Sequence, residues 1–198
     1  SYRRSRYNGS NNNLNLNYNK DKISMFANLN AGIWQSFQDL YINRYYKDLT
    51  GARTSSFNQN SFNGRSGQYI NGRAGLDFYP NDQTAMGISF KRSASPTSRS
   101  TDNTSLVRNK GGDVLQRVVA DNLDESTFDN ALLNVYYTRT LDTLGSKLTV
   151  DADYVTYGST NDQVFKNFVY DEKDLLQYED EINGDIPSNI EIMAGKLD

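Results

Sequence analysis

Hydrophobic and polar residues alternate most regularly in the segment from Asn130 to Tyr157. Because successive side chains of a β-strand point to opposite faces, this alternation predicts strands with one apolar and one polar face. A short turn joins the two arms, so we expect an antiparallel hairpin. Each arm is about ten residues long, the length of a tilted strand that crosses a bilayer. The apolar face of the second arm carries Leu148, Val150, Ala152, Tyr154 and Thr156, and its polar face carries Thr149, Asp151, Asp153 and Val155.

The same alternation predicts seven strands in all. Three connections between them are short turns, whereas the other three are the long polar segments 35–68, 93–128 and 159–188, which we expect to be loops. In an antiparallel meander, alternate connections lie at opposite ends, so all three long loops fall at one end, as in outer-membrane barrels. Soluble domains seldom contain several structureless connections of this length. The predicted strands cover residues 12–20, 23–34, 69–79, 84–93, 129–141, 147–158 and 190–198.

The predicted fold class is therefore all-β, an antiparallel up-and-down transmembrane β-barrel. In lipid every backbone polar group needs an internal partner, so only helices and closed barrels span a membrane. Six strands and part of a seventh are fewer than the roughly eight that the smallest such barrel needs. We expect residues 1–198 to form a single, incomplete segment of a barrel domain with an unpaired strand at each edge.

Charged residues within the predicted strands lie opposite the apolar positions, and we expect them to face a hydrated lumen. Arg or Lys in the lipid-facing middle of a strand costs about 2–4 kcal/mol, but little in a lumen. Paired carboxylates can also bind Ca²⁺ or transfer protons, although solvation in the lumen is the favoured interpretation. The predicted lumen-facing residues are Arg73, Asp77, Asp151 and Asp153.

Composition excludes several classes of function. The 198 residues include no Cys and no His, which removes the usual zinc ligands, cysteine nucleophiles and the commonest general base. We therefore predict that the protein is not an enzyme and holds no metal or cofactor. A net charge of -3 disfavours nucleic acid as a partner.

No apolar run is long enough for a transmembrane helix. No signal peptide is visible, so we expect an exported protein to extend upstream of this chain.

Aromatic residues within the long polar segment 35–68 and at its start are candidates for ligand binding. Tyr and Trp among Asn, Ser and Gly form adaptable contact surfaces. One hypothesis is that they bind a nutrient or a surface lipoprotein, although plain loop packing is the favoured interpretation. The candidates are Trp34, Phe37, Tyr41, Tyr45 and Tyr46.

Four segments carry a resemblance to a known family: LNLNYNKDKISMFANLNAGIW, FNQNSFNGRSGQYINGRAGLDFYPNDQTAMGISF, NVYYTRTLDTLGSKLTVDADYVTYG and IEIMAGKLD. They resemble the outer-membrane β-barrel family of Bacteroidota, which is similar to the C-terminal barrel of TonB-dependent receptors. The resemblance implies a location in the outer membrane of a Gram-negative bacterium, contact with its lipid, and further strands beyond Asp198. It also implies a plug domain before Ser1 and an energy-transducing periplasmic partner that acts through segments outside this chain.

The function that these expectations favour is a TonB-dependent-like receptor or transporter that imports a nutrient or another large substrate. A passive pore, or a structural or secretion-associated barrel, is the first alternative. A soluble β-sandwich that binds ligands at the cell surface is the second.

Overall fold

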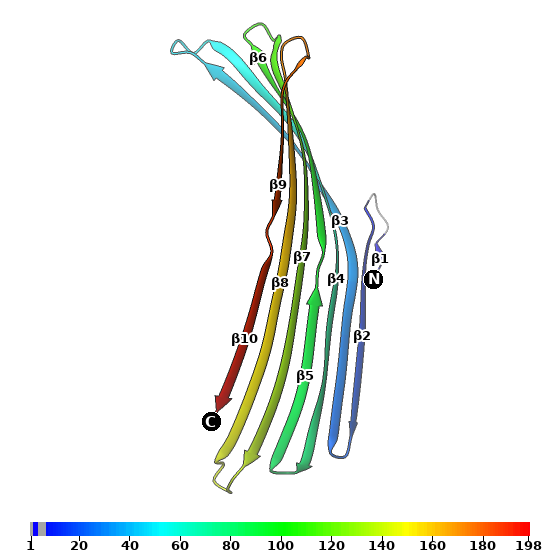
Figure 1. Ribbon diagram of the computed structural model, residues 1–198. Helices are drawn as coiled ribbons and strands as arrows, with labels where there is room; N and C mark the ends of the chain where they lie inside the picture. The colour runs from blue at the N-terminus through cyan, green and yellow to red at the C-terminus, as the bar shows by residue number, and fades with distance from the viewer. Residues whose placement is uncertain (1, 4–6) are drawn as a thin grey trace.

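The alternating segments form β-strands, and every pairing between strands is antiparallel (Figure 1). The computed structural model of the protein describes residues 2–3 and 7–198. No helix of this described part is long and apolar enough to cross a membrane. The strands are β1 (Tyr2–Arg3), β2 (Gly9–Lys20), β3 (Ile23–Lys47), β4 (Arg53–Asn81), β5 (Thr84–Ala94), β6 (Thr97–Asn109), β7 (Val114–Thr140), β8 (Lys147–Tyr170), β9 (Leu176–Asp185) and β10 (Ser188–Leu197).

The predicted hairpin is present. It consists of the second half of β7 and the first half of β8, which lie toward the lower end of the sheet in Figure 1. Asn130 lies opposite Tyr157, and the pairing continues without interruption to Thr140 opposite Lys147. The alternation predicted for the second arm is confirmed, because residues 148–156 all lie within one continuous strand. Five of the seven predicted strand segments lie wholly within strands of the structure, and the segments 129–141 and 190–198 extend one residue beyond the ends of β7 and β10.

The prediction of three long loops is wrong. Segment 35–68 is the upper half of β3 and the first part of β4, segment 93–128 contains β6 and the first half of β7, and segment 159–188 completes β8 and contains β9. Only the turns 48–52, 110–113 and 171–175 remain unpaired at that end of the sheet. These strand halves have polar residues on both sides, so they lack the contrast between faces that identified the lower halves. Their Thr, Tyr and Phe nevertheless favour extended backbone, and the paired strands satisfy its hydrogen bonds.

Two strands of the meander are each divided by a proline. β5 and β6 lie end to end between β4 and β7, separated by Ser95 and Pro96. Proline has no backbone N–H to donate, but the carbonyl of Pro96 still accepts a 3.1 Å hydrogen bond from the Gln68 N–H. β9 and β10 are divided in the same way around Pro187, and both pair with β8. Apart from the short β1, the sheet is therefore a meander of seven strand paths, the number that the sequence predicts.

The sheet is a single layer that curves along its length and does not close on itself (Figure 1). Among the described residues no hydrophobic side chain is buried, and the four buried polar residues are Ser56, Ser61, Asn63 and Ser105. A soluble domain buries apolar side chains and leaves polar ones in water. The described residues of this chain have no such apolar core.

Candidate functional site

The two sides of the sheet differ sharply in chemistry in its lower half, toward the turns after β2, β4 and β7. Strand register aligns one residue from each of seven strands into rows across the sheet. Two neighbouring rows on one side contain no charged, amide or hydroxyl side chain except the phenols of two tyrosines. We name this the apolar side. The first row is Leu16, Ala27, Ala74, Phe90, Leu133, Tyr154 and Met193, and the second is Tyr18, Met25, Leu76, Ile88, Val135, Ala152 and Gly195.

The upper edge of the apolar region is higher on β3 than on the strands from β5 to β10. On β3 the apolar positions extend up to Ile33, whereas on β8 they end at Tyr154. Through the register, Tyr154 aligns with Ala27 of β3, which is six residues below Ile33. On β5 the apolar positions already end at Phe90, because Arg92 is the next residue on that side, and Phe90 lies in the same row as Tyr154 and Met193. The edge therefore falls between β3 and β5 and is nearly level from β5 to β10. β2, at the border of the sheet, departs from this trend, because its apolar positions end at Leu14.

The opposite, polar side of the lower sheet is rich in amides and charges. A hollow of about 580 Å³ lies on it, spanning β2 to β8. Asn134 donates a 2.8 Å hydrogen bond to the Asp153 carboxylate, and the Tyr136 hydroxyl donates a 2.8 Å bond to Asp77. The hollow is lined chiefly by Asn13, Asn15, Asn28, Asn30, Asn71, Arg73, Ser89, Lys91, Leu132, Asn134 and Asp153.

The four residues predicted to face a lumen all lie on this polar side. Asp77 and Asp151 belong to one row, with Gly87 and Tyr136 between them, and Asp153 belongs to the next. They do not converge on one point, and the described residues include no group of carboxylates placed to hold a metal ion. The Arg73 guanidinium lies 5.0 Å from the centre of the Phe26 ring. That this side lines a lumen stays a prediction.

Aromatic rings on the polar side lie over glycines of neighbouring strands, a feature that the sequence analysis missed. A Cβ atom added to Gly67 would lie 2.7 Å from the Trp34 ring, and one added to Gly75 would lie 2.5 Å from Phe26. Gly32 has the same relation to Tyr69, and Gly87 to Tyr136. Glycines within regular strands were the available signal, since such glycines often mark close approach by another group.

The predicted binding aromatics do not form one site. All five lie on β3, a strand and not a loop, so the expected loop location is wrong. Phe37, Tyr41 and Tyr45 are on the apolar side of the sheet above the apolar rows, whereas Trp34 and Tyr46 are on the polar side. Phe37 stacks on Tyr7 with ring centres 4.8 Å apart, and Tyr41 is 67% exposed. Their role in binding stays a prediction.

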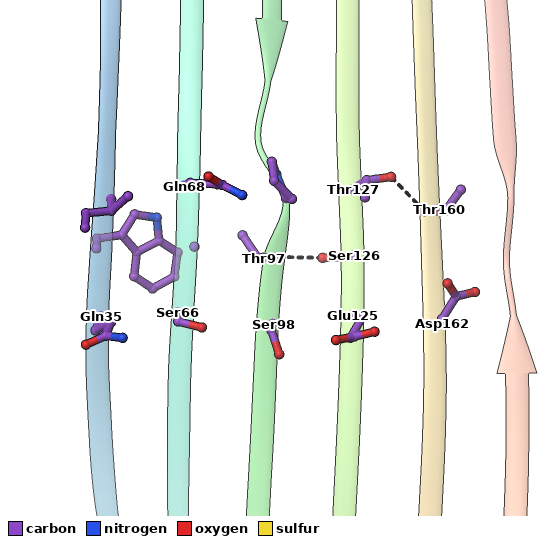
Figure 2. A pocket seen from close by; sticks show the side chains of 14 residues that line it. Gln35, Ser66, Gln68, Thr97, Ser98, Glu125, Ser126, Thr127, Thr160 and Asp162 are labelled. Atoms are coloured by element: carbon purple, nitrogen blue, oxygen red, sulfur yellow. Dashed lines mark hydrogen bonds between the residues drawn. The ribbon is translucent and has the colours of Figure 1, made fainter. Parts of the chain in front are cut away.

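A second hollow, of about 530 Å³, lies where Pro96 interrupts the strand path between β5 and β6. Most of its lining residues are on the apolar side, directly above the apolar rows. Figure 2 shows Gln35, Ser66, Ser98, Glu125 and Asp162 aligned across five strands there. Desolvation, followed by the charges of Asp185 and Glu125, raises the pKa of Asp162. The Thr127 and Thr160 hydroxyls are hydrogen-bonded at 2.7 Å beside it.

Comparison with known proteins gives no family assignment, because no family model and no curated protein matches the sequence. The functional argument therefore depends on the arrangement of side chains on the two sides of the sheet.

Proposed function

We propose that the chain is part of a transmembrane β-barrel in the outer membrane of a Gram-negative bacterium, with its apolar side against lipid. The observation that carries the proposal is the pair of uninterrupted apolar rows on an uncovered side of the sheet. In water this arrangement would expose a large contiguous apolar surface, which monomeric soluble proteins rarely do. In a bilayer the same rows face hydrocarbon, while the polar side faces the interior of the barrel.

The dimensions of the apolar region support this assignment. Transmembrane barrels have strand tilts of about 35–45°. On β3 the apolar positions run from Ile23 to Ile33. At such tilts these positions span about 24–28 Å of membrane thickness, close to the apolar band of about 25 Å in such barrels.

Within this class we favour a receptor or transporter, of the TonB-dependent-like kind, that takes up a nutrient or another large substrate. The hollow on the polar side supports a transport role, because its amides and charges suit a hydrated passage. The long upper halves of the strands would project beyond the bilayer toward the cell exterior. Closing the sheet into a barrel requires strands in addition to the seven paths described here.

A passive pore has the same lipid-facing side and differs in lacking a plug and an energy-transducing partner. A soluble β-sandwich is disfavoured by strand length, since β3, β4, β7 and β8 have 24 to 29 residues and strands of globular proteins usually have three to ten.

Membrane fractionation of the intact protein tests the proposal. We expect it in the outer-membrane fraction, resistant to extraction by alkaline carbonate and released only by detergent. A folded protein that remains in the aqueous fraction without detergent would contradict the proposal. Uptake of a substrate that depends on the periplasmic energy-transducing system then separates the receptor from the passive pore.

A further inference from the structure

Two pairs of like charges lie directly opposite each other on the polar side of the sheet. Arg73 of β4 is in register with Lys91 of β5, and Arg65 of β4 is in register with Arg99 of β6. Like charges at directly opposed positions of neighbouring strands destabilise a sheet. Two such pairs on adjoining strand paths therefore call for a compensating negative charge.

No ion pair forms at either pair within the described part of the chain. No described carboxylate is within ion-pair distance of Arg73, Lys91, Arg65 or Arg99. Arg73 contacts the Phe26 ring, and Arg99 donates a 3.3 Å hydrogen bond to the neutral Asn63 side chain.

Acidic residues on the same side are bound to neutral partners. Asp77 accepts from Tyr136, Asp153 from Asn134, and Asp124 from Gln163. Asp124 is in register with Arg99, and Asp153 lines the same hollow as Arg73 and Lys91, but neither carboxylate forms an ion pair with these residues. All four cationic residues are exposed.

The surroundings of the lower pair suit an anionic group. Arg73 and Lys91 line the 580 Å³ hollow together with several asparagine side chains. A guanidinium presents two parallel N–H donors that match a carboxylate, sulfate or phosphate, and an ammonium adds a compact charge. Asparagine side chains add donors and acceptors for neutral polar groups of the same ligand.

The spacing of the two pairs indicates a ligand with several charges. Arg65 and Arg73 are eight residues apart on the same side of β4, which corresponds to about 26 Å. Trp34 lies across Gly67, between the two pairs, and is the only tryptophan of the chain. The lower pair lies at the depth of the apolar rows and the upper pair lies above them.

We propose that the polar side of the sheet binds a polyanionic ligand that carries carboxylate, sulfate or phosphate groups, with Arg65–Arg99 as the outer contact and Arg73–Lys91 as the inner one. This inference rests on the proposed function in one respect, that the polar side lines a hydrated passage. It adds the charge class of the ligand and the residues that recognise it.

Titration of the intact, detergent-solubilised protein tests the inference, with dextran sulfate as the probe and uncharged dextran of equal length as the control. Isothermal titration calorimetry measures affinity, and Trp34 fluorescence reports occupancy between the pairs. We expect binding of dextran sulfate that weakens with salt, and no binding of dextran. The double variant Arg73→Gln/Lys91→Gln should weaken binding at least about tenfold, and Arg65→Gln/Arg99→Gln should do likewise. The matched control is Arg92→Gln, on the opposite side of the sheet, which should leave affinity unchanged.

Equal affinity of the double variants and Arg92→Gln, or no binding of dextran sulfate, would overturn the inference. Stability gives an independent check on folding and on the missing counter-charge. Removing like-charge repulsion should leave the unfolding midpoint unchanged or raise it in the absence of ligand. A lower midpoint in the Arg73→Gln/Lys91→Gln variant would show that a carboxylate of the protein already pairs with these residues, and would also reject the inference. Since these readouts do not depend on membrane fractionation, failure here and failure of the proposed function can be distinguished.

Discussion

Replacing Leu16 by Arg places a charge in the middle of the apolar side of β2. Leu14, Leu16 and Tyr18 are the apolar positions of that strand, and Leu16 belongs to a row that is apolar across all seven strand paths. In a transmembrane barrel, Arg at the bilayer midplane costs about 2–4 kcal/mol of folding free energy. Leu16 is already 56% exposed, so in an aqueous sheet the same substitution should change stability by no more than about 0.5 kcal/mol.

Asn17 provides the matched control, because it is the next residue at nearly the same depth and points to the polar side. We expect Asn17→Arg to change the free energy of unfolding by less than about 0.5 kcal/mol. The assay is urea-dependent folding of the intact protein into phospholipid vesicles, followed by tryptophan fluorescence. A loss of about 2–4 kcal/mol for Leu16→Arg alone supports the account. Equal effects of the two variants would refute the assignment of the apolar side to lipid.

Four further substitutions test local features. Gly87→Ala should lower unfolding stability by about 1–3 kcal/mol, because its Cβ would lie 2.5 Å from an Asp77 oxygen, whereas Gly72→Ala, with its nearest neighbour at 3.9 Å, should be nearly neutral by the same measurement. Hydrogen bonds from Ser146 and the turn backbone lower the pKa of Asp142, so its stabilisation of the β7–β8 turn is present above the ordinary carboxyl pKa and is lost as pH falls through the lowered value. The protection of amides in that turn, relative to their intrinsic exchange rates, should therefore fall in acid, and Asp142→Asn should remove most of this pH dependence. The pKa of Asp162 is raised, so the charge of its carboxylate opposes folding at neutral pH. Asp162→Asn should therefore raise the unfolding midpoint at neutral pH and leave it unchanged below the ordinary carboxyl pKa.

The lower half of the sheet was predictable because its two sides have opposite polarity. From Leu148 to Tyr154 each residue differs in kind from its neighbours, and that contrast fixes both the strand and its orientation. The placement of Arg73 and Asp153 on one side follows from the same periodicity once the register is known.

The upper half was not predictable by that criterion, because residues such as Asn58 and Gln59 make both sides of the strand polar. A different signal was present in the turns. Asp48, Asn109, Asp142 and Asp171 each accept a hydrogen bond from the backbone N–H four residues later. The residue just before that donor has a positive φ, at Gly51, Gly112, Gly145 and Asp174. An Asp or Asn followed three residues later by Gly, or here once by Asp, thus marks a tight turn between strands.

The site was less predictable than the fold. All five predicted aromatics lie in one extended strand, so their side chains alternate between the two sides of the sheet. Trp34 and Tyr46 are on one side, and Phe37, Tyr41 and Tyr45 are on the other. The cationic pairs depend on register between β4 and its neighbours, and a one-residue slip would have placed Lys91 on the other side.

Site-directed spin labelling along residues 148–156 of β8 tests the central claim most directly. The chain has no cysteine, so single cysteines can be introduced without a competing thiol within these residues. In the intact protein reconstituted into vesicles, the account predicts high accessibility to oxygen at Leu148, Val150, Ala152 and Tyr154, and high accessibility to a water-soluble nickel chelate at Thr149, Asp151 and Asp153. Access of the nickel chelate to both sets, or protection of Val150 and Ala152 from both reagents, would contradict a lipid-facing apolar side.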